Sequence, residues 1–252
     1  MIRITNTVKH LVIINVVVFL GTQLLKSRGI YLDNYLALFF IKNDLFMPWQ
    51  FFTTMFMHAD FQHLLFNMLG LWMFGSALEQ MWGKNKFLFF YFSAGIGASL
   101  IYTLANYLQF QPVYNDLITA GLTDLNVNNI LETGNYDRSI LKYVSEKSLT
   151  NFYYIYNTPA VGASGAIMGV LVAFGMLFPN SQLMLLFPPI PVKAKYLISF
   201  LVIIDLIGGF TGGFSLFGRG NVAHWAHLGG AIIGFIMMLY WKKNQFNDKR
   251  WN

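Results

Sequence analysis

Residues 160–178 read AVGASGAIMGVLVAFGMLF, a stretch of 19 residues without a charged side chain. A helix of this length can cross a bilayer, whose hydrocarbon core is about 30 Å thick. Near its start, Ser164 stands among small residues in GASG. A second apolar stretch, residues 222–241, carries His227 at a similar distance from its own start. The two stretches predict membrane helices that bring a serine and a histidine to the same depth.

The whole chain has the composition of a polytopic membrane protein. Of its 252 residues, 56% are hydrophobic and only 11% are charged, and the mean hydropathy is +0.49. A soluble domain of this size is less apolar. Six stretches are long and apolar enough to span a membrane: residues 8–25, 64–82, 87–108, 160–178, 196–214 and 222–241. We therefore expect an all-α membrane protein that forms a single domain over residues 1–252.

Two connections between these stretches are long. Residues 26–62 are amphipathic and rich in aromatic side chains, as expected of a first outer loop that lies in the membrane interface. Residues 109–159 are rich in polar side chains and contain the turn signal TGN at 133–135, which predicts an extramembrane insert between the third and fourth helices. The proline-rich residues 179–195 predict a link that interrupts the helical pattern.

The charges favour a topology with both termini in the cytoplasm. The net charge is +6, but the Lys and Arg residues are spread in pairs at the ends of the apolar stretches, so we expect the bilayer as partner and no nucleic acid. With a cytoplasmic N-terminus, ten of the 17 Lys and Arg residues fall on the inner side, in agreement with the positive-inside rule. The second, fourth and sixth helices then begin in the same leaflet. Because no transit peptide precedes the first stretch, we expect a bacterial-type inner membrane.

Ser164 and His227 are the candidate catalytic pair. A serine hydroxyl is a weak nucleophile until a base accepts its proton, and a neutral histidine does this at ordinary pH. Small residues on both helices would let the backbones approach closely enough for the pair to meet. These residues are Gly162, Gly165, Gly230 and Gly234. The alternative interpretation of the glycines is helix packing alone, since small residues at a spacing of four are common in membrane helices.

His63 and Asn67 are candidates for stabilising an oxyanion. They lie four residues apart and therefore project from one face of the second helix, near its outer end. Both side chains donate hydrogen bonds, and peptide hydrolysis passes through an oxyanion that fixed donors stabilise. The backbone N–H of Ser164 is a third candidate donor. The alternative is a polar clamp between helices without a catalytic role.

Together these residues resemble the rhomboid family of intramembrane serine proteases. The marks are HxxxN from His63, GxSG around Ser164 and HxxGxxxG from His227, in this order on alternate helices. The resemblance extends to Glu79, near the inner end of the second helix. It implies a six-helix bundle and a Ser164–His227 dyad without an acidic third member. It also implies transmembrane proteins as substrates and no cofactor.

The resemblance carries further expectations for two histidines. It implies that His58 lies behind the site or anchors a loop, and that His224 is a neighbouring histidine without a catalytic role. One departure concerns the first outer loop, where many relatives have a Trp-Arg pair. Here Trp49 is followed by Gln50, so the anchoring of that loop cannot be carried over.

Asp205 is the single carboxylate deep within a predicted span. It lies nine residues from position 214, the predicted outer end of its helix, whereas His227 lies five residues from position 222. This count predicts that the two side chains differ in depth by several ångströms at helical rise. We therefore expect a structural hydrogen-bonding role for Asp205, protonated or paired.

Three other functions stay open at this point. The first is a rhomboid-like protein that binds transmembrane clients without cutting them, although such proteins commonly lack the serine or the histidine. The second is a transporter, which the gathering of polar residues in one leaflet disfavours. The third is a metal or haem site at His58, His63, His224 and His227. The HExxH motif is absent, and the chain has no cysteine, so we expect no metal.

Overall fold

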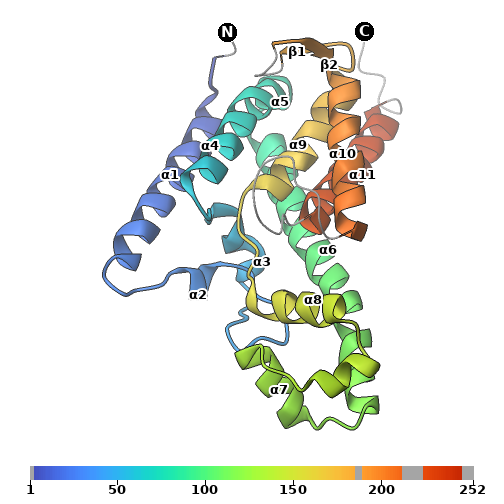
Figure 1. The fold of residues 1–252 in the computed structure, drawn as a ribbon. Helices are drawn as coiled ribbons and strands as arrows, with labels where there is room; N and C mark the ends of the chain where they lie inside the picture. Colours follow the sequence, from blue (N-terminus) through green and yellow to red (C-terminus); the bar gives the residue numbers. More distant parts are fainter. Residues whose placement is uncertain (1–2, 185–188, 212–223, 246–252) are drawn as a thin grey trace.

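The computed structural model describes residues 3–184, 189–211 and 224–245, and helices dominate it (Figure 1). The N-terminal half contains α1 (Asn6–Lys26), α2 (Asp33–Leu36), α3 (Gln50–Thr53), the 3₁₀ turn η1 (Thr54–Phe56), α4 (Phe61–Gly70), the π-helical turn η2 (Leu71–Gly75), α5 (Ser76–Trp82) and α6 (Lys84–Thr119). The C-terminal half contains α7 (Asp124–Thr133), the 3₁₀ turn η3 (Arg138–Lys142), α8 (Glu146–Asn157), α9 (Ser164–Leu177), β1 (Gln182–Met184), β2 (Pro191–Lys193), α10 (Ala194–Thr211) and α11 (His224–Gln245). Together, α4, η2 and α5 follow one another without a break.

Each apolar stretch contains a helix, although the bounds differ from those predicted. Among the described helices, α1, α6 and α10 are long and apolar enough to cross a membrane, and the apolar α9 is shorter, with 14 residues. Helix α9 begins at Ser164 rather than at residue 160, and α6 continues to Thr119, past residue 108. The predicted ends at residues 214 and 222 lie outside the described residues. The number of spanning helices, six, therefore stays a prediction.

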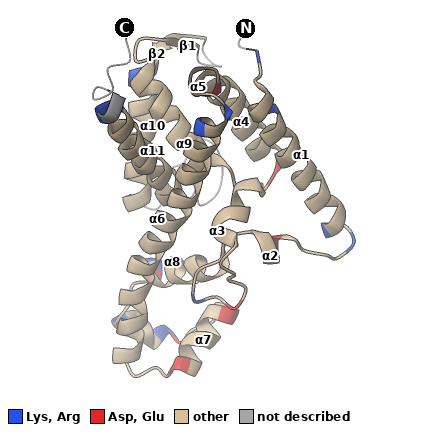
Figure 2. Ribbon diagram, turned by 180° about the vertical axis from the view of Figure 1, so that it is seen from behind, with Lys and Arg blue, Asp and Glu red and all other residues tan. Residues whose placement is uncertain are grey.

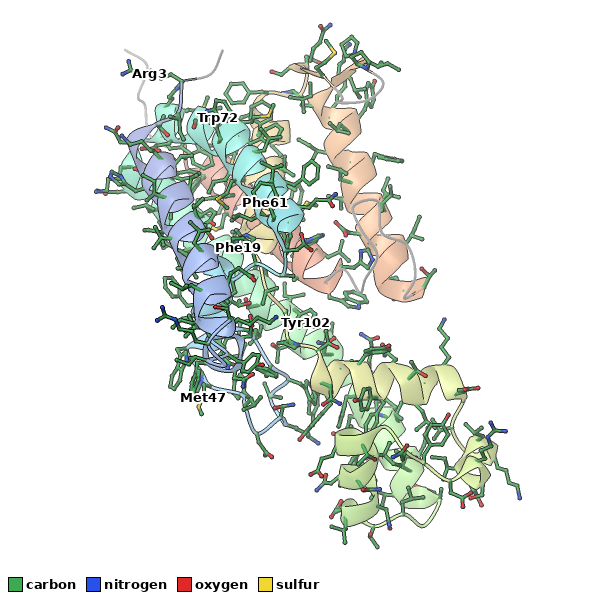
Figure 3. The ribbon with its side chains drawn as sticks, turned by 60° about the vertical axis from the view of Figure 1, so that its left-hand side comes forward. Arg3, Phe19, Met47, Phe61, Trp72 and Tyr102 are labelled. Atoms are coloured by element: carbon green, nitrogen blue, oxygen red, sulfur yellow. The ribbon has the colours of Figure 1, made fainter. Side chains whose placement is uncertain are left out.

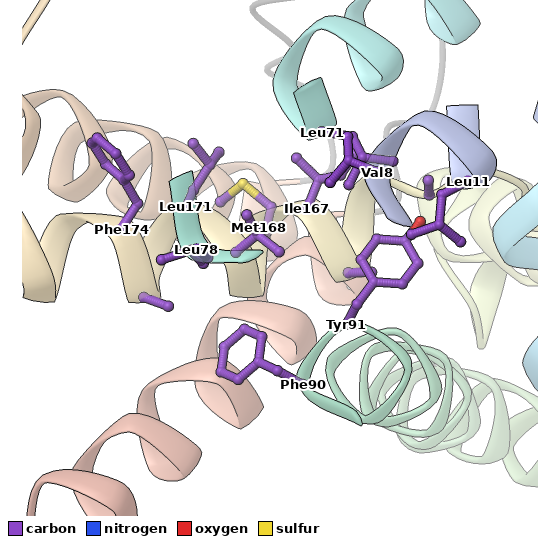
Figure 4. Packing of buried hydrophobic residues seen from close by; sticks show 14 of the residues in the cluster. Val8, Leu11, Leu71, Leu78, Phe90, Tyr91, Ile167, Met168, Leu171 and Phe174 are labelled. Carbon is purple, nitrogen blue, oxygen red and sulfur yellow. The ribbon is translucent and has the colours of Figure 1, made fainter. Parts of the chain in front are cut away.

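The hydrophobic core of the bundle lies between the N-terminal helices and α9. Buried side chains from α1, η2, α5, α6 and α9 meet there (Figure 4). They include Val8, Leu11, Leu71, Leu78, Phe90, Tyr91, Ile167 and Met168. The close packing of these side chains fixes α9 against α1, η2, α5 and α6. Ala163, which directly precedes Ser164, belongs to the same core.

Helix α9 and helix α11 approach each other through glycines. A Cβ added to Gly234 would lie 2.7 Å from the Cα of Gly169, closer than real Cβ atoms come to other heavy atoms. A Cβ added to Gly165 would lie 2.6 Å from the Cβ of Ala98 in α6. Only residues without a side chain permit this backbone contact.

Residues 109–159 form a small helical unit with a core of its own. The end of α6, α7, η3 and α8 enclose a second cluster of buried apolar side chains, and Phe40 from the first loop joins it. The ring centroids of Phe110 and Phe152 lie 4.2 Å apart, and those of Phe40 and Phe110 lie 4.7 Å apart. The predicted turn at 133–135 is observed, because Gly134 has a φ of 71° and ends α7. The insert projects from one end of the bundle (Figures 1 and 3).

The link over residues 179–195 differs from the all-α expectation. Strands β1 and β2 pair antiparallel, with Leu183 opposite Val192. The hairpin satisfies backbone groups at a place where prolines exclude a helix. It lies at the same end of the bundle as the start of α1, the end opposite the insert (Figure 1). Lys and Arg residues lie mainly at the ends of the bundle and in the insert (Figure 2).

Candidate active site

The segment before Ser164 is tied to the first loop. The N–H of Gly162 donates to the carbonyl oxygen of Thr54 at 3.0 Å, and the Thr54 hydroxyl donates to the carbonyl oxygen of Ala160 at 2.6 Å. Ala160 also exchanges two backbone hydrogen bonds with Leu38, of 2.8 and 3.0 Å. Gly162 has a φ of +123°, a conformation that side chains disfavour. The loop thus fixes the direction from which the chain enters α9.

Ser164 and His227 are in hydrogen-bond contact. The Oγ of Ser164 lies 2.8 Å from the Nε2 of His227, and both residues are only half-buried. Ser164 is the first residue of α9, and His227 lies in the first turn of α11. An Nε2 without a proton can accept the Ser164 O–H in this geometry, which is the arrangement of a nucleophile and its base.

The start of α9 also supplies backbone donors. The first N–H groups of a helix have no acceptor within the helix, and the helix dipole places partial positive charge there. Ala163 precedes the helix, and no side chain caps its N-terminus. The N–H of Ser164 therefore lies beside its own hydroxyl and is free to bind an anionic oxygen.

His63 lies beside the nucleophile, on the other side of Gly162. A Cβ added to Gly162 would lie 2.7 Å from the Nε2 of His63 and 3.6 Å from the Oγ of Ser164. Asn67 is buried, and its amide donates to the carbonyl oxygen of His63 in its own helix at 3.0 Å. The structure brings His63 to Ser164, whereas the recorded hydrogen bond of Asn67 goes to the backbone of α4.

His58 lies behind His63. Its side chain is buried, and its ring meets the ring of His63 edge-on, with the centroids 5.1 Å apart. Burial, together with the neighbouring His63, lowers the pKa of His58 to about 4. The ring is therefore neutral at physiological pH. Asp60, which follows in the same loop, caps α4 by accepting the His63 N–H at 2.8 Å.

Asp205 contradicts the prediction from residue counts. Its Oδ1 lies 3.0 Å from the Nδ1 of His227 and 2.8 Å from the Nδ1 of His224, so the three side chains share one depth. The count failed because it assumed that the helix of Asp205 ends at residue 214, that the helix of His227 begins at residue 222, and that both ends lie at the same depth in the membrane. Both positions lie outside the described residues, and distances along two different helices do not share a common origin. His227 thus has an acidic neighbour, whereas the catalytic dyad implied by the resemblance stays a prediction.

Sequence reasoning did not find the role of Gln50. This residue is fully buried: its Oε1 accepts the N–H of Phe39 at 3.2 Å, and its Nε2 donates to the carbonyl oxygen of Leu45 at 2.7 Å. Trp49 donates from its Nε1 to the carbonyl oxygen of Tyr35 at 2.8 Å. The Trp-Gln pair therefore holds the first loop through neutral hydrogen bonds to its backbone. Its position after a tryptophan was the single signal in the sequence.

Glu79 lies far from the site and caps α1. Its carboxylate accepts the N–H groups of Thr7 and Val8, at 3.1 and 3.0 Å, and the hydroxyl of Thr5. A carboxylate at a helix N-terminus satisfies free N–H groups and interacts favourably with the helix dipole. This charge joins α5 to the start of α1.

The four histidines that sequence analysis left open as metal ligands form two separate groups. His58 contacts His63, while His224 and His227 both contact Asp205. In the described part of the chain, no group of three or more His, Asp or Glu side chains has the arrangement of a metal site.

Known proteins resemble the chain over most of its length. A family model described as "Rhomboid domain" matches residues 46–124 and 138–244. "Rhomboid protein 1, mitochondrial" of Saccharomyces cerevisiae is 27% identical over 238 residues, which are 94% of this chain and 54% of that protein. "Rhomboid protease AarA" of Providencia stuartii is 28% identical over 201 residues, which are 76% of this chain and 55% of that protein. "RHOMBOID-like protein 12, mitochondrial" of Arabidopsis thaliana is 26% identical over 194 residues, which are 77% and 46% of the two chains. The chain spans about half the length of these curated relatives.

Proposed function

The chain belongs to the rhomboid family, and from this premise we propose that it is an intramembrane serine endopeptidase. It would hydrolyse peptide bonds in or near the transmembrane segments of other membrane proteins. The observation that carries the proposal is the distance of 2.8 Å between the Oγ of Ser164 and the Nε2 of His227. Of the three relatives described above, one is named a protease and two are named only as rhomboid or rhomboid-like proteins, which supports the activity at the level of the family.

The reaction begins with attack of Ser164 on the carbonyl carbon of the substrate peptide bond. His227 accepts the hydroxyl proton at Nε2 as the new carbon–oxygen bond forms, and then gives this proton to the nitrogen of the leaving amine. The product is an ester between the substrate acyl group and Ser164. A water molecule then attacks the ester while His227 accepts one of its protons. His227 returns this proton to the Oγ of Ser164 as the carbon–oxygen bond breaks, which releases the carboxylic acid and the free serine.

The tetrahedral intermediate of each half-reaction carries an oxyanion. We expect the Ser164 N–H at the start of α9 and the His63 ring next to Gly162 to donate hydrogen bonds to this oxyanion. Asn67 joins them through its second N–H or after its amide has turned away from the backbone of α4. Loss of one such donor is expected to lower kcat by about 10²–10³.

The protein is an integral membrane protein, and we propose that its partners are transmembrane protein substrates and the surrounding lipid. A location in a bacterial-type inner membrane with both termini inside stays a prediction, because the relatives include proteins named as mitochondrial. Transport is less well supported than proteolysis, since Asp205, the carboxylate in α10, is bonded to two histidines.

Labelling with a fluorophosphonate and cleavage of a transmembrane reporter protein test the proposal. Wild type in detergent micelles is expected to react with the probe and to cut the reporter, whereas Ser164→Ala and His227→Ala lose both activities. Ser139→Ala, which removes an exposed hydroxyl in the insert, and His10→Ala, at an exposed position of α1, are the matched controls. A folded wild type that neither reacts nor cleaves would overturn the proposal in favour of client binding without proteolysis.

A further inference from the structure

Asp205 is a buried carboxylate with two histidine partners. It lies in α10, with 7% of its surface exposed. Its Oδ1 contacts the Nδ1 of His224 at 2.8 Å and the Nδ1 of His227 at 3.0 Å, and its Oδ2 lies 3.2 Å from the same Nδ1 of His227.

The hydrogen bond to Asp205 determines which nitrogen of His227 carries the proton. An ionised carboxylate can only accept hydrogen bonds, so the Nδ1 of His227 must donate. A neutral imidazole has a single N–H, and the Nε2 that faces Ser164 at 2.8 Å is then left with its lone pair. This is the tautomer that a general base needs, and the other tautomer would present an N–H to the serine hydroxyl.

His224 holds the carboxylate in this position. Its Nδ1 donates to the oxygen that also contacts His227, so two N–H groups converge on Asp205. The fold makes room for the ring of His224 at Gly208, one turn after Asp205, because a Cβ added there would overlap this ring. Buried ions need more than one polar partner, and these two donors supply them.

We propose that Asp205 is a positioning residue that completes a Ser164–His227–Asp205 triad, with His224 fixing the carboxylate. The inference rests on the proposed function and departs from the dyad that the family resemblance implies. Asp205 keeps its negative charge throughout, and no proton moves to it. When His227 takes the serine proton and becomes an imidazolium, the carboxylate stabilises the new positive charge.

Two variants and a control separate this role from a structural one. Asp205→Asn keeps the volume of the side chain but can offer an N–H to Nδ1, so the wrong tautomer of His227 is favoured. We expect its kcat on the reporter substrate to fall by about 10²–10⁴, with KM changed less than threefold. The kcat of Asp205→Glu is expected to be at least tenfold higher than that of Asp205→Asn, because glutamate retains the carboxylate acceptor. Asp116→Asn, at an exposed site of the insert, is expected to match wild type.

A measurement of the tautomer gives a readout that needs no activity. The protein is labelled with ¹⁵N-histidine, and the signals of His227 are assigned by their absence in His227→Ala. We expect protonated Nδ1 and bare Nε2 in wild type, and protonated Nε2 in Asp205→Asn. A protonated Nε2 in wild type, or Asp205→Asn with wild-type kcat, would overturn the inference. If Asp205→Asn does not fold, the wild-type spectrum and Asp205→Glu decide.

The same experiments separate a failure of the inference from a failure of the proposed function. If wild type neither reacts with the fluorophosphonate nor cleaves, the proposed protease activity fails, and a catalytic triad fails with it. If wild type is active and Ser164→Ala is not, but Asp205→Asn is as active as wild type, the dyad stands and the triad alone is wrong.

Discussion

Gly165 and Gly230 face each other so closely that a single methyl group would not fit between them. A Cβ added to Gly230 would overlap the carbonyl oxygen of Gly165. Gly165 directly follows Ser164, and Gly230 lies nearly one helical turn after His227. The contact between the backbones of α9 and α11 therefore lies directly beside the hydrogen bond between the two side chains, and the separation of the helices sets its length.

Gly230→Ala is accordingly expected to damage both stability and activity. Forcing a methyl group into a packed contact costs about 1–3 kcal/mol, and here the obstacle is backbone, which cannot rotate away. The melting temperature in detergent and the rate of reporter cleavage measure the two effects. Gly21→Ala is the control, because a Cβ at Gly21 meets no atom within 4 Å. Equal melting temperatures for the two variants would contradict the close approach of α9 and α11.

Gly162→Ala is expected to lower activity more than stability. The new methyl group would lie 2.7 Å from the Nε2 of His63, so the ring must leave its place beside Ser164, and kcat should fall by about 10²–10³. Gly29→Ala shares the positive φ, here 80°, but has no neighbour within 4 Å. Both variants should lose roughly 1 kcal/mol of stability from backbone strain. If Gly29→Ala lost as much activity per folded molecule, strain rather than His63 would explain the effect.

Gln50→Met tests the anchoring of the first loop. The substitution keeps the length of the side chain but leaves the N–H of Phe39 and the carbonyl oxygen of Leu45 without this partner. Each buried group left unpaired costs about 1–3 kcal/mol, so the melting temperature should fall clearly. Gln182→Met, at an exposed position of β1, should have little effect. Unchanged stability of Gln50→Met would show that water or another group replaces the amide.

Glu79→Gln is expected to weaken the start of α1. A neutral amide has one acceptor oxygen in place of two and interacts less with the helix dipole, which predicts a loss of about 1–2 kcal/mol. Proteolysis of the N-terminal segment by an added soluble protease, followed over time, would report the loosening of α1. Glu132→Gln, at an exposed position of α7, should be cut no faster than wild type. The prediction fails if Glu79→Gln and wild type are cut at the same rate.

His58 predicts a pH dependence of stability. Burial lowers the pKa of His58 from 6.5 to about 4, so between these values the unfolded chain binds more protons than the folded one. The contribution of His58 to the free energy of unfolding should be at its maximum above pH 6.5. It should fall by up to about 3 kcal/mol as the pH falls to 4. Melting curves of wild type and His58→Gln across this range check it, with His10→Gln as control. Parallel pH profiles for wild type and His58→Gln would exclude this contribution.

Much of the fold followed from hydropathy, because the length and the apolar character of a membrane helix are local properties of the sequence. The helix-rich architecture and the positions of the helices were predicted in this way. Helix bounds were less accurate, as α9 shows: residues 160–163 are as apolar as the helix, but they bond to the first loop. The core of the insert was missed as well, since its apolar residues are separated by polar ones and belong to four elements.

The proximity of Ser164, His63 and His227 could be predicted from the order of the helices and from the chemistry that a serine nucleophile requires of its neighbours. The contact between Asp205 and His227 could not be predicted, because it depends on the position of α10 relative to α11 along their axes. The anchoring by Gln50 depends on the path of an irregular loop, which no periodic pattern encodes.

Helix α6 is longer than a membrane span, and we predict that its second half carries the insert outside the bilayer. Its 36 residues measure about 54 Å along the axis, whereas the hydrocarbon core is about 30 Å thick. Helix α6 begins at the end of the bundle opposite the insert. With this end at one boundary of the hydrocarbon core, about 24 Å of α6 would extend beyond the other boundary, through the headgroup layer toward the insert. A partner protein whose folded domain lies beyond the insert would need about seven extended residues between that domain and its membrane helix. The length of this linker would therefore limit which membrane proteins can approach the bundle beside the insert.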